Sequence, residues 1–410
     1  MNQSSQGVSS SHWRTPLVVI IAGCLISLIG FGIRSVFGLF LEPMTLAHDW
    51  SRETFAIALA IQNLLWGLGV PVAGAMADRY GPTRVLSFGA LLYAIGVWGM
   101  AGTDSGMGLY LFAGLITGLG IAFSAFSIAL AAMARVVGPE KRTLALGLGT
   151  AAGSLGQVLF SPLGQQFIAA FGWQTALLIL AAIALAMIPF ALLLPGSQAH
   201  QGEPESDQSL VEALNEAMAH RGFLLLTVGF FVCGFHVAFI TVHFPSYITD
   251  LGLEPEVGAY ALALIGLFNI IGSFLSGAAG TRWSKKGGLA FIYFTRAAVI
   301  SAMLLAPKSE LTIYLFSAAM GILWLSTVPL TSGIVAQVFG VRYMATLFGI
   351  VFFSHQLGSF IGVWLGGRLY DTTGTYSTVW WAGVVLGLLA ALIHLPINER
   401  PLARLQPESA

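Results

Sequence analysis

Arg34 and His236 are the two residues of this chain whose types and positions best fit chemistry inside a membrane. Each lies in a long apolar stretch, and the second follows the first by 202 positions (34 to 236). Their surroundings match in spacing: Gly32-Ile33-Arg34 is followed by Pro43, and Gly234-Phe235-His236 by Pro245. A guanidinium can bind a carboxylate through its planar fork, and a histidine can gain a proton near physiological pH. The pattern predicts an anion-binding group and a titratable group at equivalent places in two copies of one membrane unit.

Arg34 is expected to line a water-accessible cavity and to pair with an anionic substrate. A charged side chain at the centre of a bilayer costs roughly 2.5–3.5 kcal/mol on insertion scales unless it reaches a partner or water. No Asp or Glu lies deep in any apolar stretch to neutralise Arg34. The alternative is a structural arginine that caps the backbone carbonyls of a broken helix.

His243 follows His236 by seven residues, close to two helical turns, so the two share a face. We expect one or both to contact the substrate and to couple its binding to a proton. The alternative is that both form hydrogen bonds between helices.

Further polar or aromatic residues lie at membrane depth and are candidates for substrate contacts. They are Gln62, Asn63, Asn269, Trp324, His355 and Gln356. The alternative for each is a hydrogen bond that only packs helices together. Arg296, near the middle of another stretch, is expected to serve packing or to meet a lipid headgroup.

Twelve apolar stretches can position these residues. Hydrophobic residues make up 56% of the 410-residue chain and charged residues 9%, against roughly 45–50% and 25% in soluble domains. About 20 apolar residues cross the hydrocarbon layer as a helix. The predicted spans are 16–41, 52–77, 84–101, 107–134, 143–170, 173–194, 221–249, 256–281, 287–306, 310–337, 342–369 and 376–397. The sequence predicts an all-α membrane protein with twelve transmembrane helices.

The spans divide into two pseudo-symmetric six-helix halves, 16–194 and 221–397. A polar linker, 195–220, joins them, and residues 210–219 within it are expected to form a surface helix. Tails at 1–15 and 398–410 flank the halves. The repeat recurs along the chain: Gly147 and Gly156 match Gly349 and Gly358 at the same shift of 202.

The distribution of Lys and Arg predicts the orientation. With the N-terminus in the cytoplasm, thirteen of the 18 basic residues fall inside and only Arg52, Lys308 and Arg368 fall outside. Basic residues accumulate on the cytoplasmic side of membrane proteins. Both tails and the linker are therefore expected in the cytoplasm, and the location is expected to be a bacterial cytoplasmic (inner) membrane.

Gly74, Asp78, Arg79, Gly81 and Arg84 lie between the second and third spans in the order and spacing of the loop signature of the major facilitator superfamily, so the chain resembles that superfamily. Arg34–Phe40 with Pro43, and Lys141–Gly147 with Pro162, resemble its monocarboxylate-porter-like branch, which includes bacterial organic-anion carriers. Eukaryotic-type members of this branch carry an Asp and an Arg in span eight, where this chain has Asn269 and Ser273.

This resemblance implies the major facilitator fold, in which spans one, two, four, five, seven, eight, ten and eleven surround a central cavity. It also implies that the five residues of the loop signature form a cytoplasmic latch, with Asp78 facing the start of span eleven. The latch would set the balance between inward-open and outward-open states rather than bind cargo.

The predicted function is secondary active transport of a small organic anion, a monocarboxylate, by alternating access with proton symport. The alternative is an efflux carrier for a neutral or lipophilic compound. An enzyme is not expected, because no His-Glu-x-x-His sequence and no buried carboxylate pair occur. No cofactor or metal is expected, and the balance of 18 basic and 18 acidic residues gives no surface for nucleic acid. The expected partners are the anion, protons and the lipid bilayer, and the expected state is a monomer.

Overall fold

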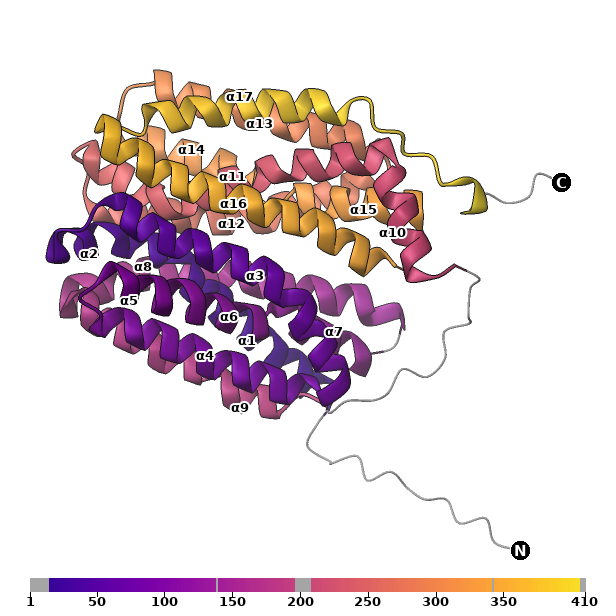
Figure 1. The fold of residues 1–410 in the computed structure, drawn as a ribbon, viewed down its shortest axis with the longest axis horizontal. Coiled ribbons are helices and arrows are strands. Elements are labelled where there is room, and N and C mark those ends of the chain that lie inside the picture. The colour runs from indigo at the N-terminus through magenta and orange to yellow at the C-terminus, as the bar shows by residue number, and fades with distance from the viewer. Residues whose placement is uncertain (1–14, 138, 196–207, 341–342, 406–410) are drawn as a thin grey trace, which may run out of the picture.

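The computed structural model describes residues 15–137, 139–195, 208–340 and 343–405, and it is helical without strands over those residues. The side chains of residues 78, 134, 135, 139–146 and 345 are not among those described. The predicted tail before residue 15, most of the polar linker and the last residues of the C-terminal tail also lie outside them. The helices form two packed bundles, one from each half of the chain (Figure 1).

Over residues 15–137 and 139–195, the N-terminal bundle contains nine α-helices, a 3₁₀ turn (η1) and a π-helical segment (η2). In chain order they are α1 (Pro16–Ser35), η1 (Phe37–Phe40), α2 (Leu41–His48), α3 (Arg52–Tyr80), α4 (Pro82–Gly102), α5 (Gly106–Leu109), η2 (Tyr110–Ile116), α6 (Thr117–Phe123), α7 (Phe126–Val136), α8 (Pro139–Leu185) and α9 (Met187–Leu192).

The C-terminal bundle follows a short surface helix, α10 (Leu210–Ala219), whose bounds are those expected from the sequence. Ser209 and Glu212 close a capping box at the start of α10. The other elements are α11 (Arg221–Asp250), α12 (Pro255–Gly280), α13 (Lys285–Leu305), α14 (Glu310–Leu323), α15 (Thr327–Phe339), α16 (Met344–Thr373), α17 (Ser377–His394) and η3 (Ala403–Leu405).

The described residues hold eleven helical stretches that are long and apolar enough to cross a membrane. One of them, Gly147–Leu192, has 46 residues. At 1.5 Å per residue it would be about 69 Å long, roughly twice the hydrocarbon thickness of a bilayer. Gly172 breaks it with φ 79° and ψ 161°, a conformation that glycine adopts without strain. It therefore holds two crossings, which gives the twelve spans that the sequence predicts.

The fourth and tenth spans are discontinuous at equivalent places in the two halves. In span four the helix ends at Phe123 and α7 begins at Phe126, and in span ten α14 ends at Leu323 and α15 begins at Thr327. Ser124 and Ser326, which lie in the two breaks, are 202 positions apart. Broken helices in matching positions of two repeats are typical of transporter binding regions.

Two pairs of long helices join the halves near the middle of the bundle. Gln356 of α16 donates a hydrogen bond from Nε2 to the backbone oxygen of Asn63 in α3 (2.9 Å). Gln157 of α8 donates in the same way to the oxygen of Leu262 in α12 (2.9 Å). The contact of span eleven with span two is thus repeated by the contact of span five with span eight, as a two-fold pseudo-symmetry requires.

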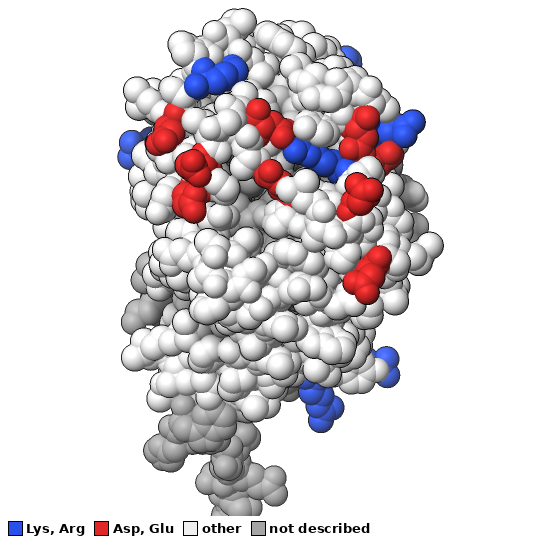
Figure 2. Space-filling model, turned by 90° about the vertical axis from the view of Figure 1, so that its left-hand side faces the viewer, with Lys and Arg blue, Asp and Glu red and all other residues white. Residues whose placement is uncertain are grey.

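Charged side chains join the halves at one end of the bundle, which faces the viewer in Figure 2. Arg52 of α3 and Asp250 of α11 form a two-pronged ion pair with both N···O distances at 2.7 Å. Arg368 of α16 pairs with Glu53 of α3 (3.1 Å). Asp371 accepts backbone N–H bonds from Arg52 and Glu53 at the start of α3. We call this end the Arg52 end, and the opposite one, where α10 lies, the α10 end.

Candidate functional site

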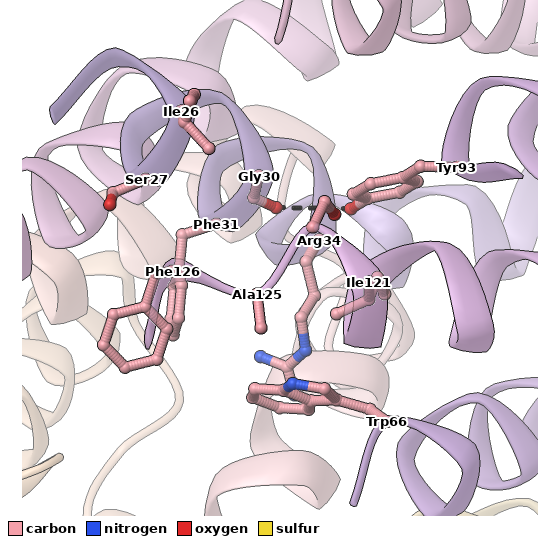
Figure 3. A pocket seen from close by; sticks show the side chains of 11 residues that line it. Ile26, Ser27, Gly30, Phe31, Arg34, Trp66, Tyr93, Ile121, Ala125 and Phe126 are labelled. Carbon is pink, nitrogen blue, oxygen red and sulfur yellow. Dashed lines mark hydrogen bonds between the residues drawn. The ribbon is translucent and has the colours of Figure 1, made fainter. Parts of the chain in front are cut away.

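The strongest candidate site is a small hollow around Arg34 in the N-terminal bundle. It lies between α1, α3, α4 and the break in span four, and Figure 3 shows the arginine reaching into it. The lining residues are Ile26, Ser27, Gly30, Phe31, Arg34, Trp66, Tyr93, Ile121, Ser124, Ala125 and Phe126. Most of the wall is apolar or aromatic, and Arg34 is the one charged residue among the described residues that line it.

The guanidinium of Arg34 is held by an amide and an aromatic ring. Nη2 donates to Oδ1 of Asn63 at 3.0 Å. The guanidinium carbon lies 4.4 Å from the centre of the Trp66 ring and 5.9 Å from that of Phe31 (Figure 3). Cation–π contacts of this kind orient a guanidinium and leave its charge in place. In the part of the chain that the structure describes, no carboxylate lies within ion-pair distance of Arg34.

A second small hollow extends the site to the boundary between the halves. The N-terminal half lines it with Arg34, Phe37, Leu59, Gln62 and Asn63. Helix α11 of the other half lines it with Ala238, Thr241 and Val242. Arg34 is shared by both hollows. A ligand bound to the guanidinium could therefore touch both halves, as alternating access requires.

The break in span four brings a helix start to the first hollow. Ser124, Ala125 and Phe126 line its wall, and α7 begins at Phe126. The first N–H groups of a helix have no partner within the helix, and its N-terminus carries partial positive charge. Arg34 and the start of α7 thus give this hollow two features that favour an anion.

Gln62 and Asn63 lie beside Arg34, as a substrate site would need. Gln62 lines the second hollow and donates from Nε2 to the oxygen of Ala113 (2.9 Å). Asn63 accepts from Arg34 and donates from Nδ2 to the oxygen of Leu59 (2.8 Å). Gln356 lies one contact away, because it holds the Asn63 backbone from α16.

His236 and His243 lie outside both hollows. His236 donates from Nε2 to the oxygen of Gly383 in α17 (2.8 Å), and its ring is 1% exposed. His243 is fully buried between Tyr376 and Val363. The structure therefore does not bring either imidazole to Arg34. The equivalence of position 236 to position 34 holds along the chain, while the two side chains meet different neighbours.

The other predicted contacts divide between helix packing and the span-ten break. Asn269 donates to Ser154 (3.0 Å) and accepts from the backbone N–H of Leu325 (3.0 Å). Trp324 is buried in the same break. His355 donates from Nδ1 to Oε1 of Gln356 (3.0 Å) and stacks on Phe352. None of these side chains lines either hollow.

Arg296 is fully buried and points towards the break in span ten, not towards lipid. Its Nη2 donates to the backbone oxygens of Leu323 (2.6 Å) and Trp324. Both oxygens belong to the end of α14, where the helical partners of carbonyls are lost. The expected headgroup contact is therefore wrong, and the expected packing role describes the side chain. Arg296 thus caps the backbone carbonyls of a broken helix, the role given above as the alternative for Arg34.

The loop signature lies at the α10 end, with Gly74, Asp78 and Arg79 in the last turns of α3, Gly81 between the helices and Arg84 in the first turn of α4. Gly81 ends α3 with φ 91°, which suits glycine alone, and Gly74 has free space around it. Arg79 lies over the Tyr80 ring, and both Arg79 and Arg84 are exposed. The Asp78 side chain lies outside the described residues, so its predicted contact with span eleven stays a prediction.

The aromatic residues that shape the site were not predicted from the sequence. Trp66 holds the guanidinium, and Tyr93 closes the far wall by donating to the oxygen of Gly30 (3.3 Å) (Figure 3). The sequence holds one indication that Trp66 lies near Arg34. Trp66 follows Asn63 by three residues, so the two share the α3 face that meets Arg34.

The chain is similar to a known protein family along most of its length. A family model described as Major Facilitator Superfamily matches residues 23–363. Monocarboxylate transporter 13 from Bos taurus is 26% identical over 95% of this chain and 92% of its own length. An uncharacterized MFS-type transporter, YcxA, from Bacillus subtilis is 24% identical over 88% of this chain and 90% of its own length.

Solved structures share the fold at low sequence identity. A bacterial homologue of the human lysosomal transporter Spinster, in an inward-facing and unoccupied conformation, aligns with a TM-score of 0.74 at 16% identity, over 94% of this chain and 97% of that one. The D-xylose-proton symporter aligns with a TM-score of 0.72 at 14% identity, over 94% and 99%.

Proposed function

The chain belongs to the major facilitator superfamily and is a multi-pass membrane transporter of a small molecule, and on that premise we propose that its cargo is a small organic anion. The single observation that carries this proposal is the Arg34 guanidinium, which faces two hollows without a carboxylate partner among the described residues. A carboxylate would supply the missing counter-charge and accept two parallel N–H bonds.

The walls of the hollow suggest the body of the cargo. The rings of Phe31, Trp66, Tyr93 and Phe126 surround Arg34. Of their polar atoms, the Trp66 indole N–H can donate, and the Tyr93 hydroxyl already donates to Gly30. A monocarboxylate with a short apolar body would satisfy the cation and leave no polar group unpaired. The relatives named monocarboxylate transporters support this cargo class.

The distribution of charge supports an orientation with the α10 end in the cytoplasm. Arg52, Arg368 and Lys308 are the basic residues predicted outside, and Figure 2 shows the Arg52 end as a face on which acidic side chains are prominent. In this orientation, the ion pairs at the Arg52 end close the carrier towards the outside. We further propose a monomer in a bacterial inner membrane and proton symport as the driving reaction.

Transport by purified protein in proteoliposomes tests the cargo. Counterflow of labelled monocarboxylates should be robust for the wild type and fall by about 10- to 100-fold for Arg34→Gln, the range expected for loss of a charged hydrogen bond. Arg34→Lys should retain part of the activity, because it keeps the charge and loses the fork.

Arg404→Gln is a matched control, since Arg404 pairs with Glu216 outside the bundle. It should transport like the wild type. Undiminished carboxylate uptake by Arg34→Gln would show that Arg34 does not bind the cargo. Absence of carboxylate counterflow in the wild type would overturn the anion proposal and favour the alternative, efflux of a neutral or lipophilic compound, for which the aromatic lining is also suited.

A further inference from the structure

A chain of hydrogen bonds connects buried His243 to the ion pair that joins the halves. Nδ1 of His243 lies 3.1 Å from the hydroxyl of Tyr376, and that hydroxyl lies 3.0 Å from Nη1 of Arg52. The same Nη1 is 2.7 Å from Asp250. The chain therefore runs from a fully buried imidazole to a carboxylate whose side chain is 27% exposed.

Every proton in this chain can be assigned. Nε2 of His243 lies 2.8 Å from the backbone oxygen of Val363, which can only accept, so Nε2 carries hydrogen. Arg52 can only donate, so the Tyr376 oxygen accepts from it and turns its own hydrogen towards His243. Nδ1 of His243 is then an acceptor. The arrangement requires a neutral imidazole and a neutral phenol.

The groups around the chain favour this assignment. They are Arg52 of α3, Tyr247 and Asp250 of α11, Tyr370 and Asp371 of α16, and Tyr376 before α17. Burial raises the pKa of the Tyr376 phenol above its usual value, against the lowering effect of Arg52, so the phenol keeps its hydrogen. Asp250 and Asp371 are both engaged by Arg52, through its side chain and its backbone N–H.

A proton on Nδ1 cannot be accommodated without change. Both ring nitrogens would become donors, and the Tyr376 hydroxyl would have to turn its hydrogen away from His243. An imidazolium would also face the Arg52 guanidinium across a single oxygen atom. Like charges at that spacing repel strongly in a dry interior. Movement of Arg52 away from Tyr376 relieves both problems, and Arg52 is the residue that ties α3 to α11.

We propose that His243 is a proton-binding site that controls the Arg52 end: a proton on Nδ1 displaces the Tyr376 hydrogen bond, loosens Arg52 and favours separation of the two halves there. The inference deepens the proposed function, on which it rests for the role of the proton in transport. A proton would reach Nδ1 from the exposed Asp250 side when the halves part transiently.

The test measures the opening of the Arg52 end directly, without substrate. Spin labels at Asp104→Cys, before α5, and Glu256→Cys, at the start of α12, report on the two halves from exposed positions. Cys24 and Cys233, the free cysteines, are replaced by alanine. Distances are recorded by double electron–electron resonance in nanodiscs over a pH series from about 7.5 to about 4.5, because burial of an imidazole disfavours its charged form and calls for a more acid range than the usual histidine pKa.

The population with the longer distance should rise about threefold or more on acidification of the parent protein, as titration of one histidine over this range allows. His243→Gln, which can still donate to Val363, should abolish the rise. Tyr376→Phe should abolish it as well, because it removes the hydroxyl between His243 and Arg52. This second variant keeps the test decisive if the first does not fold.

His48→Gln is the matched control. His48 lies at the same end, in α2, and stacks on Trp50 without taking part in the hydrogen bonds from His243 to Asp250. It should respond like the parent. A full rise in both His243→Gln and Tyr376→Phe, or its loss in His48→Gln, would overturn the inference. If the distance measurement contradicts the role of His243, Arg34-dependent counterflow can still be observed. If carboxylate transport is not observed, the distance measurement can still be interpreted. The two proposals can therefore fail separately.

Discussion

Gly156 of α8 and Gly358 of α16 lie at equivalent close contacts between helix backbones in the two halves of the bundle. A Cβ atom at Gly156 would lie 2.1 Å from the backbone oxygen of Leu28, and one at Gly358 would lie 1.9 Å from that of Phe231. Each glycine therefore lets two long helices approach backbone to backbone, α8 with α1 and α16 with α11. Their separation of 202 residues (156 to 358) is that of the sequence repeat. The sequence repeat therefore places a glycine in each half where two helix backbones must touch.

Gly358→Ala should destabilise the protein, because the new methyl group forces α16 away from α11. Overpacking of a tight contact costs about 1–3 kcal/mol, so the thermal midpoint in detergent should fall measurably. Gly349→Ala is the control in the same helix, where a Cβ atom meets nothing within 4 Å. It should be neutral or slightly stabilising, since alanine favours helix over glycine by roughly 0.5–1 kcal/mol. Equal midpoints for the two variants would contradict the packing argument.

Asn63→Asp should weaken binding of an anionic substrate while preserving the fold. The new carboxylate would replace the amide oxygen that lies 3.0 Å from Nη2 of Arg34 and would neutralise the guanidinium from within the protein. We expect a loss of carboxylate affinity of about 10-fold or more, measured by isothermal titration or by ligand-dependent thermal shift.

Asn63→Ala separates charge from geometry. It removes the same hydrogen bond and leaves the positive charge free, so it should weaken binding less than Asn63→Asp does. Identical affinities for the two variants would mean that the charge of Arg34 does not determine binding.

Arg296→Met should destabilise the C-terminal bundle without removing the anion site. The two carbonyl oxygens at the end of α14 would lose their donor. Each buried carbonyl left without a partner costs about 1–3 kcal/mol, which should outweigh the relief of burying one charge fewer. The expected result is a lower midpoint of thermal unfolding, with residual carboxylate binding at low temperature. A midpoint like that of the wild type would show that Arg296 does not brace the break.

The contact between α10 and the C-terminal segment should weaken in acid. Burial raises the pKa of Glu216, but hydrogen bonds from Arg404 and Gln208 outweigh it and hold that pKa below its usual value. The stabilisation is therefore present above the unfolded-state carboxyl pKa of about 4.3 and is lost as the pH falls through the lower folded-state value. The effect should be at most about 1 kcal/mol, because both partners are partly exposed.

Hydrogen exchange of the α10 amides measures this effect. Exchange should accelerate between about pH 5 and pH 3, after correction for intrinsic rates, and Glu216→Gln should remove that dependence. An unchanged pH dependence in Glu216→Gln would assign it to another group.

The fold was predictable because its signals are long and repeated. Twelve apolar stretches, the loop signature around Asp78 and Arg79, and the glycine repeat predict the architecture and the superfamily, and both are confirmed. The broken spans were harder to foresee. Span four contains a π-helical segment and a break at Ser124, but its hydropathy is continuous there.

The site was predictable only in part, because sequence position does not give side-chain direction. Arg34 was identified from its charge alone, since an unpaired cation in an apolar span needs a partner wherever it points. His236 occupies the equivalent position, yet a neutral imidazole can be satisfied by any nearby carbonyl, and it turns to Gly383. Trp66 carries no charge to draw attention to it, although it holds the guanidinium.

The amide partner of Arg34 has an electrical consequence for a membrane at resting voltage. Because Asn63 is uncharged, the guanidinium keeps its full positive charge when the carrier is empty, and a bound monovalent anion would cancel it. A membrane potential acts with about 2.3 kcal/mol per elementary charge per 100 mV on charge that crosses the whole field. The potential would therefore bias the steps of the unloaded carrier. With proton symport, the bound proton restores the charge that the anion cancels, so the potential would act equally on the carrier loaded with anion and proton.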